Sequence, residues 1–422
     1  MMITVIDCSK KNYFQKLISF LDKRRIGEDN NLKIVSRILK DLKKYKIKGL
    51  IKYERKFSNN SNIKPSLKKI NSSIKTLDPK VKAAIDIAYS RIFKFHSLQK
   101  MKNISYTDKF QNRLQYKYKP IDSVGIYVPA NLPSTLLMNG IPAKIAGVKR
   151  IILANPKVNG KLNSAVLYAA KKIGIKEIYS MGGAQAIGSM AYIQKVNKIV
   201  GPGNIFVTQA KKQVFGDVGI EGMIAGPSEI TILADKNTNV DEVITSMIGQ
   251  AEHDANAQCI LITKDNNLIN EVQRNIFKVN KKIPRKNISY KSLKKNGLII
   301  FVKSDTQITE VINEIAPEHL ELNISNYKKY LNKINNAGSI CIGKYSPMAV
   351  TDYNAGTNHI LPTFASSKFS SGLNLNEFYK KISHIKLSKK GVEVIGKSAT
   401  HLAEYEQLFG HALSIRSRMR RK

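Results

Sequence analysis

The sequence predicts an α/β fold, because short apolar runs alternate with amphipathic segments along most of the chain after residue 123. Apolar runs bounded by turn residues are typical of buried strands, and the segments between them repeat with helical spacing. The first such region has expected strands at 124–128, 150–154, 177–181 and 198–200, with helices around 136–146, 164–172, 184–190 and 204–214. This repeat predicts a parallel sheet with helices on both faces.

A second alternating region predicts another α/β domain, with strands near 229–234, 258–263, 297–302 and 338–342. The helix after the first of these strands is expected to begin near Thr238 or Asn239, since either residue is a good N-cap. Its buried side is expected to carry the apolar residues that recur at helical spacing, namely Val240, Val243, Ile244, Met247 and Ile248.

The two ends of the chain are expected to be helical. Roughly the first 120 residues contain basic helical segments such as 81–95. The tail at 398–418 has an apolar stripe that needs a docking surface, for which its own domain is the simplest candidate; the stripe consists of Leu402, Tyr405, Leu408 and Phe409. The predicted fold class is therefore α/β, with two incomplete Rossmann-like domains built on parallel sheets and with helical N- and C-terminal extensions.

Length and composition indicate an ordinary globular protein of about two or three domains. The chain has 422 residues, of which 42% are hydrophobic and 24% are charged. No apolar run approaches the roughly 18 residues of a membrane span and the first residues do not resemble a secretory leader, so we expect a cytoplasmic protein. Cys8, Cys259 and Cys341 form no C-x-x-C pair, so we expect buried thiols rather than disulfides or a zinc site.

The formal net charge of +39 is the electrostatic signature of a nucleic-acid binder. The lysines are nevertheless scattered over the whole chain, for example at 40–48, 68–82 and 281–295, without an arginine-rich helix, a zinc finger or an aromatic RNA-binding motif. This distribution favours a solvated lysine surface over specific nucleic-acid binding. Weak, salt-dependent association with RNA is still expected.

Two glycine clusters follow expected strands of the first region, at 182–185 and 201–204. Neither completes the G-x-G-x-x-G dinucleotide fingerprint. Each cluster lies where a strand passes into a helix, so its free amides are suited to bind a phosphate. A tight turn that needs glycine explains the clusters equally well.

Four potential metal ligands lie in the second half of the chain, namely Gln250, His253, Asp352 and His411. Gln250 and His253 are three residues apart at the end of an expected helix, so both side chains are expected on one face. Amide, imidazole and carboxylate donors together suit an open, catalytic metal site better than a closed structural site, which is usually rich in thiolates. Taken alone, a Gln-x-x-His pair is more often engaged in surface hydrogen bonds.

Glu318 and His319 lie between these ligands, in the polar segment 313–319. A carboxylate beside an imidazole can exchange protons near neutral pH, as the deprotonation of an alcohol and the activation of water require. A second polar segment, 346–362, contains Asp352 and His359. Both segments are expected to be functional loops rather than core. A salt-bridging pair in the first, and an Asx turn with a satisfied histidine in the second, are alternatives that the sequence leaves open.

From residue 127 onward the chain closely resembles the histidinol dehydrogenases, because several separate motifs occur with the order and spacing of that family. They are GIYVP at 125–129, GGAQAI at 182–187, GPGN at 201–204, AGPSE at 225–229, QAEH at 250–253, APEHL at 316–320, AGS at 337–339, DY at 352–353 and GTNHILP at 356–362, followed by Glu406 and His411.

The resemblance implies the oxidation of L-histidinol to L-histidine through bound L-histidinaldehyde, by two successive hydride transfers, in the final steps of histidine biosynthesis. The implied cofactors are NAD and one Zn²⁺ per subunit, with the zinc held by Gln250, His253, Asp352 and His411. The implied catalytic residues are Glu318 and His319, and the implied NAD-binding residues are Tyr127, Gln185 and Asn204. The implied substrate contacts are Ser228, Gln250, His253, His319, Asp352, His359, Glu406 and His411.

The resemblance also implies a homodimer in which the C-terminal segment of each chain completes the site of its partner. We expect an N-terminal helical extension at 1–23 and a first α/β domain at 24–126 and 228–373, which carries most of the metal and catalytic residues. A second, NAD-binding domain is expected at 127–227, and a dimerisation extension at 374–422. A metal-binding protein without catalysis and a nucleic-acid-binding protein remain as alternatives.

Overall fold

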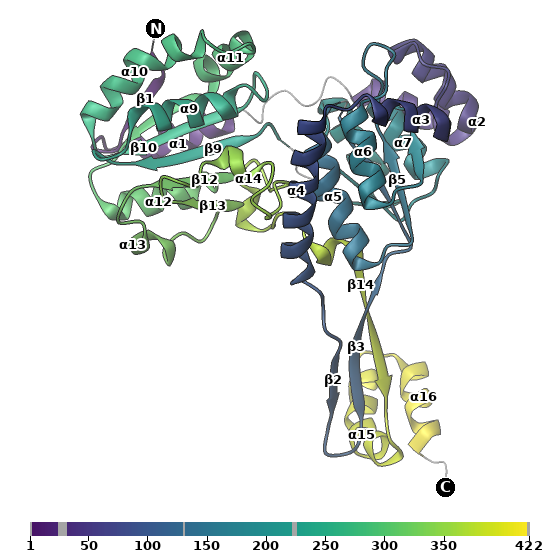
Figure 1. Ribbon diagram of the computed structural model, residues 1–422. Coiled ribbons are helices and arrows are strands. Elements are labelled where there is room, and N and C mark those ends of the chain that lie inside the picture. The colour runs from purple at the N-terminus through teal and green to yellow at the C-terminus, as the bar shows by residue number, and fades with distance from the viewer. Residues whose placement is uncertain (1, 24–31, 130, 222–225, 420–422) are drawn as a thin grey trace.

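The structure is a computed structural model, which describes residues 2–23, 32–129, 131–221 and 226–419. Within these residues the chain forms two α/β lobes, each with a parallel sheet, and an arm that projects from them (Figure 1). The predicted fold class, with parallel sheets and helical regions at both ends of the chain, is confirmed.

The first lobe is built on the parallel sheet β6-β5-β4-β7-β8. Its strands are β4 (Ser123–Tyr127), β5 (Arg150–Ala154), β6 (Glu177–Tyr179), β7 (Lys198–Val200) and β8 (Gly219–Ile220). One face is covered by α3 (Leu67–Lys75), α4 (Pro79–Ser97), α5 (Pro133–Ala146) and α6 (Ser164–Ile173). The other face is covered by α2 (Leu32–Ser58), α7 (Gly183–Tyr192) and α8 (Ile205–Val214). The strand order, with the earliest strand β4 in the middle, is that of a Rossmann fold without its sixth strand.

The second lobe is built on the parallel sheet β1-β11-β10-β9-β12-β13. Its strands are β1 (Thr4–Asp7), β9 (Glu229–Ala234), β10 (Gln258–Thr263), β11 (Gly297–Phe301), β12 (His319–Asn323) and β13 (Ser339–Ile342). One face is covered by α9 (Val240–Ala251), α10 (Asn266–Asn280) and α11 (Lys286–Asn296). The other face is covered by α1 (Tyr13–Asp22), α12 (Asp305–Ile315) and α13 (Lys328–Leu331). The short helix α14 (Met348–Thr351) packs against α9 and β12.

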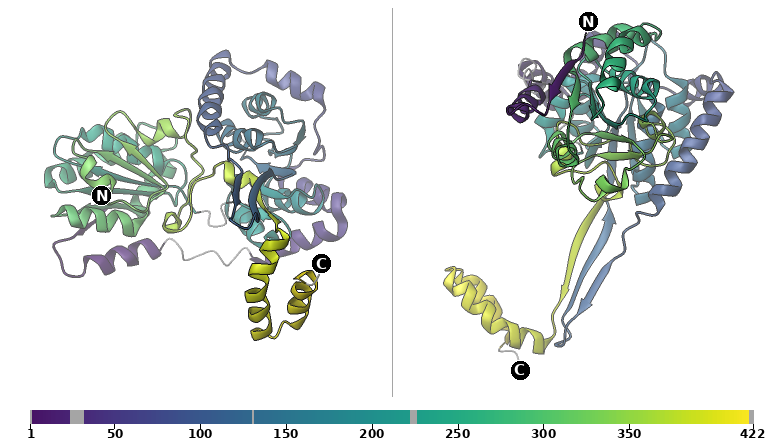
Figure 2. Two further views of the ribbon diagram at one scale, coloured as in Figure 1. Left: turned by 90° about the horizontal axis from the view of Figure 1, so that it is seen from below. Right: turned by 90° about the vertical axis from the view of Figure 1, so that its left-hand side faces the viewer.

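The arm is an antiparallel ribbon with two helices at its end, and it extends well away from both lobes (Figure 2). Its strands pair in the order β14-β3-β2, and two short 3-10 helices precede β14. These elements are β2 (Ile104–Thr107), β3 (Arg113–Pro120), η2 (Ser366–Lys368), η3 (Leu375–Phe378) and β14 (Tyr379–Lys386). The terminal helices are α15 (Lys389–Tyr405) and α16 (Phe409–Met419).

Packing differs from the expected domain bounds at both ends of the chain. Strand β1 pairs in parallel with β11, so the first 23 residues contribute a strand as well as a helix. Helices α2, α3 and α4 pack on the first lobe rather than on the lobe that contains 228–373. The helix amphipathicity predicted a buried side but carried no information about which sheet would cover it. Residues 24–31, at the first expected boundary, lie outside the described residues.

The C-terminal tail expected to be helical at 398–418 is formed by two helices. Helix α15 ends before Gln407, whose positive φ of 59° breaks the helical path, and α16 begins two residues later. The apolar stripe of the tail is exposed rather than docked on the chain's own lobes. The 374–422 segment therefore contains the strand β14 and two helices with an apolar surface that this chain leaves uncovered.

Several local expectations are confirmed. Asn239 is the N-cap of α9, and its side chain accepts a hydrogen bond from the amide of Asp241 at 2.9 Å. The three cysteines are free and buried. Across the described ranges we find no helix whose length and apolar character would allow it to span a membrane.

The turn at Gly201 is a close approach of two backbone segments. Gly201 follows β7 with a φ of 103°, and a Cβ at this position would lie 2.0 Å from the carbonyl oxygen of Tyr127. Gly183, in the other glycine cluster, has a φ of 60°. Both clusters thus form turns that need glycine, as one of the two explanations of the sequence predicted.

We expect Gly201→Ala to lower the thermal stability of the protein more than Gly216→Ala. Gly216 is a matched control, because its φ of 101° is similar but its added Cβ would meet no described atom within 4 Å. Both variants share a backbone strain of order 1–3 kcal/mol. The clash in Gly201→Ala should add about 1–3 kcal/mol, because a backbone carbonyl cannot move aside as a side chain can. Equal melting temperatures for the two variants would contradict this account.

Candidate active site

Glu318 and His319 are buried where three strands of the second lobe begin. His319 is the first residue of β12, and its Nδ1 lies 3.1 Å from Oγ of Ser339, the first residue of β13. Oε2 of Glu318 accepts a hydrogen bond of 2.7 Å from the amide of Glu229, the first residue of β9. This burial corrects the expectation that the 313–319 segment is too polar for the core. The polar side chains are tolerated there because the starts of neighbouring strands supply hydrogen-bond partners.

Asp352 brings two histidines to this pair. It follows α14 directly, and its Oδ1 lies 3.7 Å from Nε2 of His319 while its Oδ2 lies 4.0 Å from Nε2 of His253. Nε2 of His319 also lies 3.9 Å from Oε1 of Glu318. The backbone oxygen of Asp352 and Nδ1 of His359 are 2.6 Å apart, which fixes the ring of His359. The structure thus brings together five of the residues that the sequence singled out.

Gln250 completes this cluster from the last turn of α9. Its side chain is only 1% exposed, and within the described part of the chain neither its amide oxygen nor its amide nitrogen has a hydrogen-bond partner. Such an orphaned polar group is rare in a folded protein and indicates a missing partner. The last turn of a helix also carries a partial negative charge that favours a cation.

The carboxylate of Asp352 also favours a bound cation. Burial raises the pKa of Asp352 to about 7, because the negative charge is removed from water, and a cation beside it would compensate that charge. The described residues contain no group of three or more His, Cys, Asp or Glu placed to hold a metal ion. The amide of Gln250 is a donor outside these residue types, and with His253 and Asp352 it gives a three-residue set that fits Zn²⁺ with positions left open.

Two histidines of the cluster are neutral at neutral pH. Burial, together with the nearby His359 and His253, lowers the pKa of His319 to about 3. Burial lowers the pKa of His359 to about 4, although its hydrogen bond to the backbone of Asp352 opposes this shift. A neutral imidazole has a free lone pair, so His319 is suited to accept a proton.

A second cluster lies at the carboxyl edge of the sheet in the first lobe. It is next to the topological switch point between β4 and β7, where the order of the strands reverses. Tyr127 is the last residue of β4, and its Oη accepts a hydrogen bond of 3.3 Å from the amide of Gly183. Gln185 lies in the first turn of α7, and Asn204 is the N-cap of α8. The three implied NAD-binding residues are therefore at one edge of this sheet, where ligands of open α/β sheets usually bind.

A bridging loop, residues 352–364, links the two lobes, because it starts in the second lobe and packs on α4 and α5 of the first. Nδ2 of Asn358 donates to the backbone oxygen of Met138 in α5 at 2.7 Å. Nε and one Nη of Arg91 in α4 donate to the backbone oxygens of Asn354 and Ala355 at 2.5 and 3.0 Å. Sequence reasoning missed Arg91, since its neighbours along the chain form an ordinary basic helix without any motif.

Glu406 and His411 are not brought to the site within one chain. Glu406 lies at the end of α15 and His411 lies in α16, at the far end of the arm from α9 and α14 (Figures 1 and 2). Ser228, in contrast, lies beside the site, directly before β9. Ala225 of the same motif lies outside the described residues.

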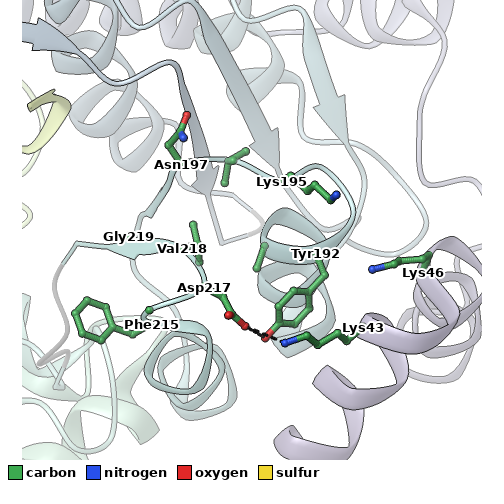
Figure 3. A pocket seen from close by; sticks show the side chains of 12 residues that line it. Lys43, Lys46, Tyr192, Lys195, Asn197, Phe215, Asp217, Val218 and Gly219 are labelled. Atoms are coloured by element: carbon green, nitrogen blue, oxygen red, sulfur yellow. Dashed lines mark hydrogen bonds and ion pairs between the residues drawn. The ribbon is translucent and has the colours of Figure 1, made fainter.

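A separate pocket of about 670 Å³ lies at the opposite edge of the first lobe, where β7 and β8 begin (Figure 3). Lys43, Lys46 and Lys195 line it, and the hydroxyl of Tyr192 donates to Asp217 at 3.0 Å. None of the residues that the sequence singled out for chemistry lines this pocket. The catalytic candidates are instead those of the buried cluster in the second lobe.

Comparisons with known proteins agree with this geometry. A family model described as histidinol dehydrogenase matches residues 21–419. The chain is 56% identical to a histidinol dehydrogenase of Pelagibacter ubique over the full length of both proteins, and 40% identical to one of Acinetobacter baylyi over 98% of each.

The fold is similar to a crystal structure of histidinol dehydrogenase from Elizabethkingia anophelis. The TM-score is 0.92 at 36% sequence identity, with 99% of this chain and 98% of the other covered. The match spans both lobes and the arm, so the buried cluster belongs to an architecture shared along the whole chain. The chain is therefore a member of the histidinol dehydrogenase family of oxidoreductases.

Proposed function

We propose that this protein oxidises L-histidinol to L-histidine with NAD⁺, through L-histidinaldehyde, in a zinc-dependent reaction. The observation that carries the proposal is the buried pair of Glu318 and His319, which are 3.9 Å apart beside Asp352. A general base and a water-activating carboxylate are needed when an alcohol is taken first to an aldehyde and then to an acid. The names of the relatives support the choice of substrate.

His319 is proposed as the base in both oxidation steps. In the tautomer with the proton on Nδ1, this N–H donates a hydrogen bond to Oγ of Ser339. Nε2 then keeps a lone pair that faces Asp352 and Glu318. Nε2 then accepts the hydroxyl proton of L-histidinol as the carbon loses a hydride. Burial lowers the pKa of His319, so the ring is neutral before the reaction and Nε2 has the lone pair that this role requires.

Glu318 is proposed to activate the water that hydrates the aldehyde. The amide of Glu229 holds Oε2, which leaves Oε1 on the side of His319. Oε1 accepts a proton from water while the water oxygen adds to the aldehyde carbon, and the protonated His319 returns its proton to the carbonyl oxygen, so that the hydrate forms and the ring is neutral again. His319 can then accept a proton from the hydrate as the carbon loses a second hydride.

We assign Gln250, His253, Asp352 and His411 as the zinc ligands, and Tyr127, Gln185 and Asn204 as NAD-binding residues. Bound Zn²⁺ would supply a template that orients the substrate, and bound NAD⁺ would accept hydride. Ser228, His359 and Glu406 are assigned as substrate contacts together with His319 and the zinc ligands. The cytoplasmic location stays a prediction.

We further propose a homodimer in which the arm of each chain reaches the site of its partner. The apolar surface of the arm supports this proposal, since Tyr405 is 88% exposed and Leu402, Phe409 and Leu413 are also exposed. Exposed apolar surface of this kind indicates an interface. The second lobe offers an apolar counterpart beside Asp352, where Tyr353 is exposed.

The zinc-loaded protein should form about two NADH for each L-histidinol consumed, because the reaction removes two hydrides. The absorbance of NADH measures the ratio, and a chelator should abolish the reaction. A ratio near one would show that oxidation stops at the aldehyde. No NADH from folded, zinc-loaded protein would overturn the proposed function.

His253→Ala should lose both zinc and activity, whereas Glu318→Gln should keep zinc and lose activity. His253 contributes an imidazole donor beside Asp352, while Oε2 of Glu318 is already engaged with a backbone amide. The zinc content of the purified variants, measured by atomic absorption, distinguishes the two roles. Full zinc content in His253→Ala would remove that residue from the ligand set.

Mixing unfolded His411→Ala with unfolded Glu318→Gln and refolding them together should restore activity if the arm acts on the partner. Half of the dimers would be mixed, and one of the two sites in each would be intact, so about a quarter of the wild-type activity is expected. Wild-type protein refolded in the same way provides the reference. No activity above that of the separate variants would mean that each site is built within one chain.

A further inference from the structure

Helix α2 is divided by a kink at Lys46, where φ and ψ are not helical, and its first part packs closely on α7. At Gly188 in α7 an added Cβ would lie 2.7 Å from Cδ2 of Leu39 and 3.1 Å from Cδ1 of Leu42. The glycine therefore allows this first part of α2 to lie nearer to α7 than a larger residue would allow. The last part of α2, after the kink, lies beside the turn that begins α7, because its Glu54 contacts that turn.

Glu54, in the last turns of α2, places a buried carboxylate behind this turn. Its side chain is 0% exposed, and its Oε1 accepts hydrogen bonds from the amide of Gly182 at 2.9 Å and from Nε2 of Gln185 at 2.8 Å. Within the described ranges Oε2 has no hydrogen-bond partner. Burial raises the pKa of this carboxyl, so its position is costly and needs a reason.

The bond from Gln185 decides which end of its amide faces the cluster at the carboxyl edge. Because Nε2 is held by Glu54, the amide oxygen lies on the side of Gly183, where an added Cβ would be 2.9 Å from it. The amide of Gly183 donates to Oη of Tyr127 on the same turn. Glu54 thus holds the turn and the amide of Gln185 in one arrangement without reaching the surface.

We propose that Glu54 is a positioning residue for the cofactor: its carboxylate fixes the amide orientation of Gln185 and the turn at Gly182, and so raises the affinity for NAD⁺ without contacting it. This inference rests on the NAD-binding role proposed above for Tyr127 and Gln185. The buried carboxylate of Glu54 can act only by fixing the positions of its two donors, the amide of Gly182 and the side chain of Gln185. The orientation of a side-chain amide depends on such partners.

Two variants separate geometry from charge. Glu54→Asp keeps the charge but shortens the side chain by one methylene, so the carboxylate can no longer reach both donors. Glu54→Gln keeps the length and an amide oxygen that can accept both hydrogen bonds, but it removes the charge. A role in positioning predicts that Glu54→Asp is impaired and that Glu54→Gln stays close to wild type.

The dissociation constant of NAD⁺ should be measured by calorimetry on the zinc-loaded, full-length proteins. We expect it to rise about tenfold or more in Glu54→Asp and to change little in Glu54→Gln. Zinc content and the KM for L-histidinol should stay unchanged in both, because the residues assigned to zinc and to L-histidinol lie on the second lobe and on the arm rather than around Glu54. A melting curve for each variant separates an effect on folding from one on affinity.

Equal NAD⁺ affinity in all three proteins would overturn the proposal. A loss confined to Glu54→Gln would also overturn it, since the charge rather than the geometry would then be required. An equal loss in both variants would overturn it as well, since geometry alone would then not be sufficient. Absence of NAD⁺ binding by the wild-type protein would instead overturn the cofactor assignment, and the inference about Glu54 with it. If the wild-type protein binds NAD⁺ and Glu54→Asp binds it equally well, the inference about Glu54 is overturned and the cofactor assignment stands.

Discussion

The site depends on the bridging loop, because the polar groups of this loop form hydrogen bonds in both lobes at once. Arg91 binds the backbone oxygens at its start, and Asn358 binds the backbone of α5. Asp352, just before these anchors, and His359, just after them, lie at the buried pair in the second lobe. The contacts of this loop with the first lobe therefore help to determine where Asp352 and His359 lie.

Burial gives the clusters of both lobes their chemical character. In the second lobe, Glu318 and His319 are removed from water, and the pKa of His319 falls so far that the ring is neutral. In the first lobe, Glu54 is equally buried and holds Gln185. Such groups are costly unless they are hydrogen-bonded, so the donors around them are part of each site. The two sites therefore depend on backbone amides as much as on side chains.

The location of the buried cluster around Glu318 and His319 departs from the usual arrangement of open α/β sheets. The first lobe follows the usual rule, since Tyr127 and Asn204 lie at the carboxyl edge of its sheet. In the second lobe the cluster forms where β9, β12 and β13 begin, and α9 brings Gln250 to that edge because it runs opposite to β9. The negative end of α9 and the donors of the cluster then favour a cation together. A positive helix end would have opposed it.

The sequence by itself determined the α/β class and most of the strands, and it indicated candidate residues for the chemistry, because burial patterns and motifs are local properties. It did not reveal β12, since Glu321 interrupts the apolar run and is accepted in the core only because Ser246 and the amide of Met348 bind it. It also gave no sign of Arg91 or Glu54, whose partners lie 263 and 131 residues away. Only the tertiary structure decided those contacts, because they depend on which surfaces meet rather than on neighbours along the chain.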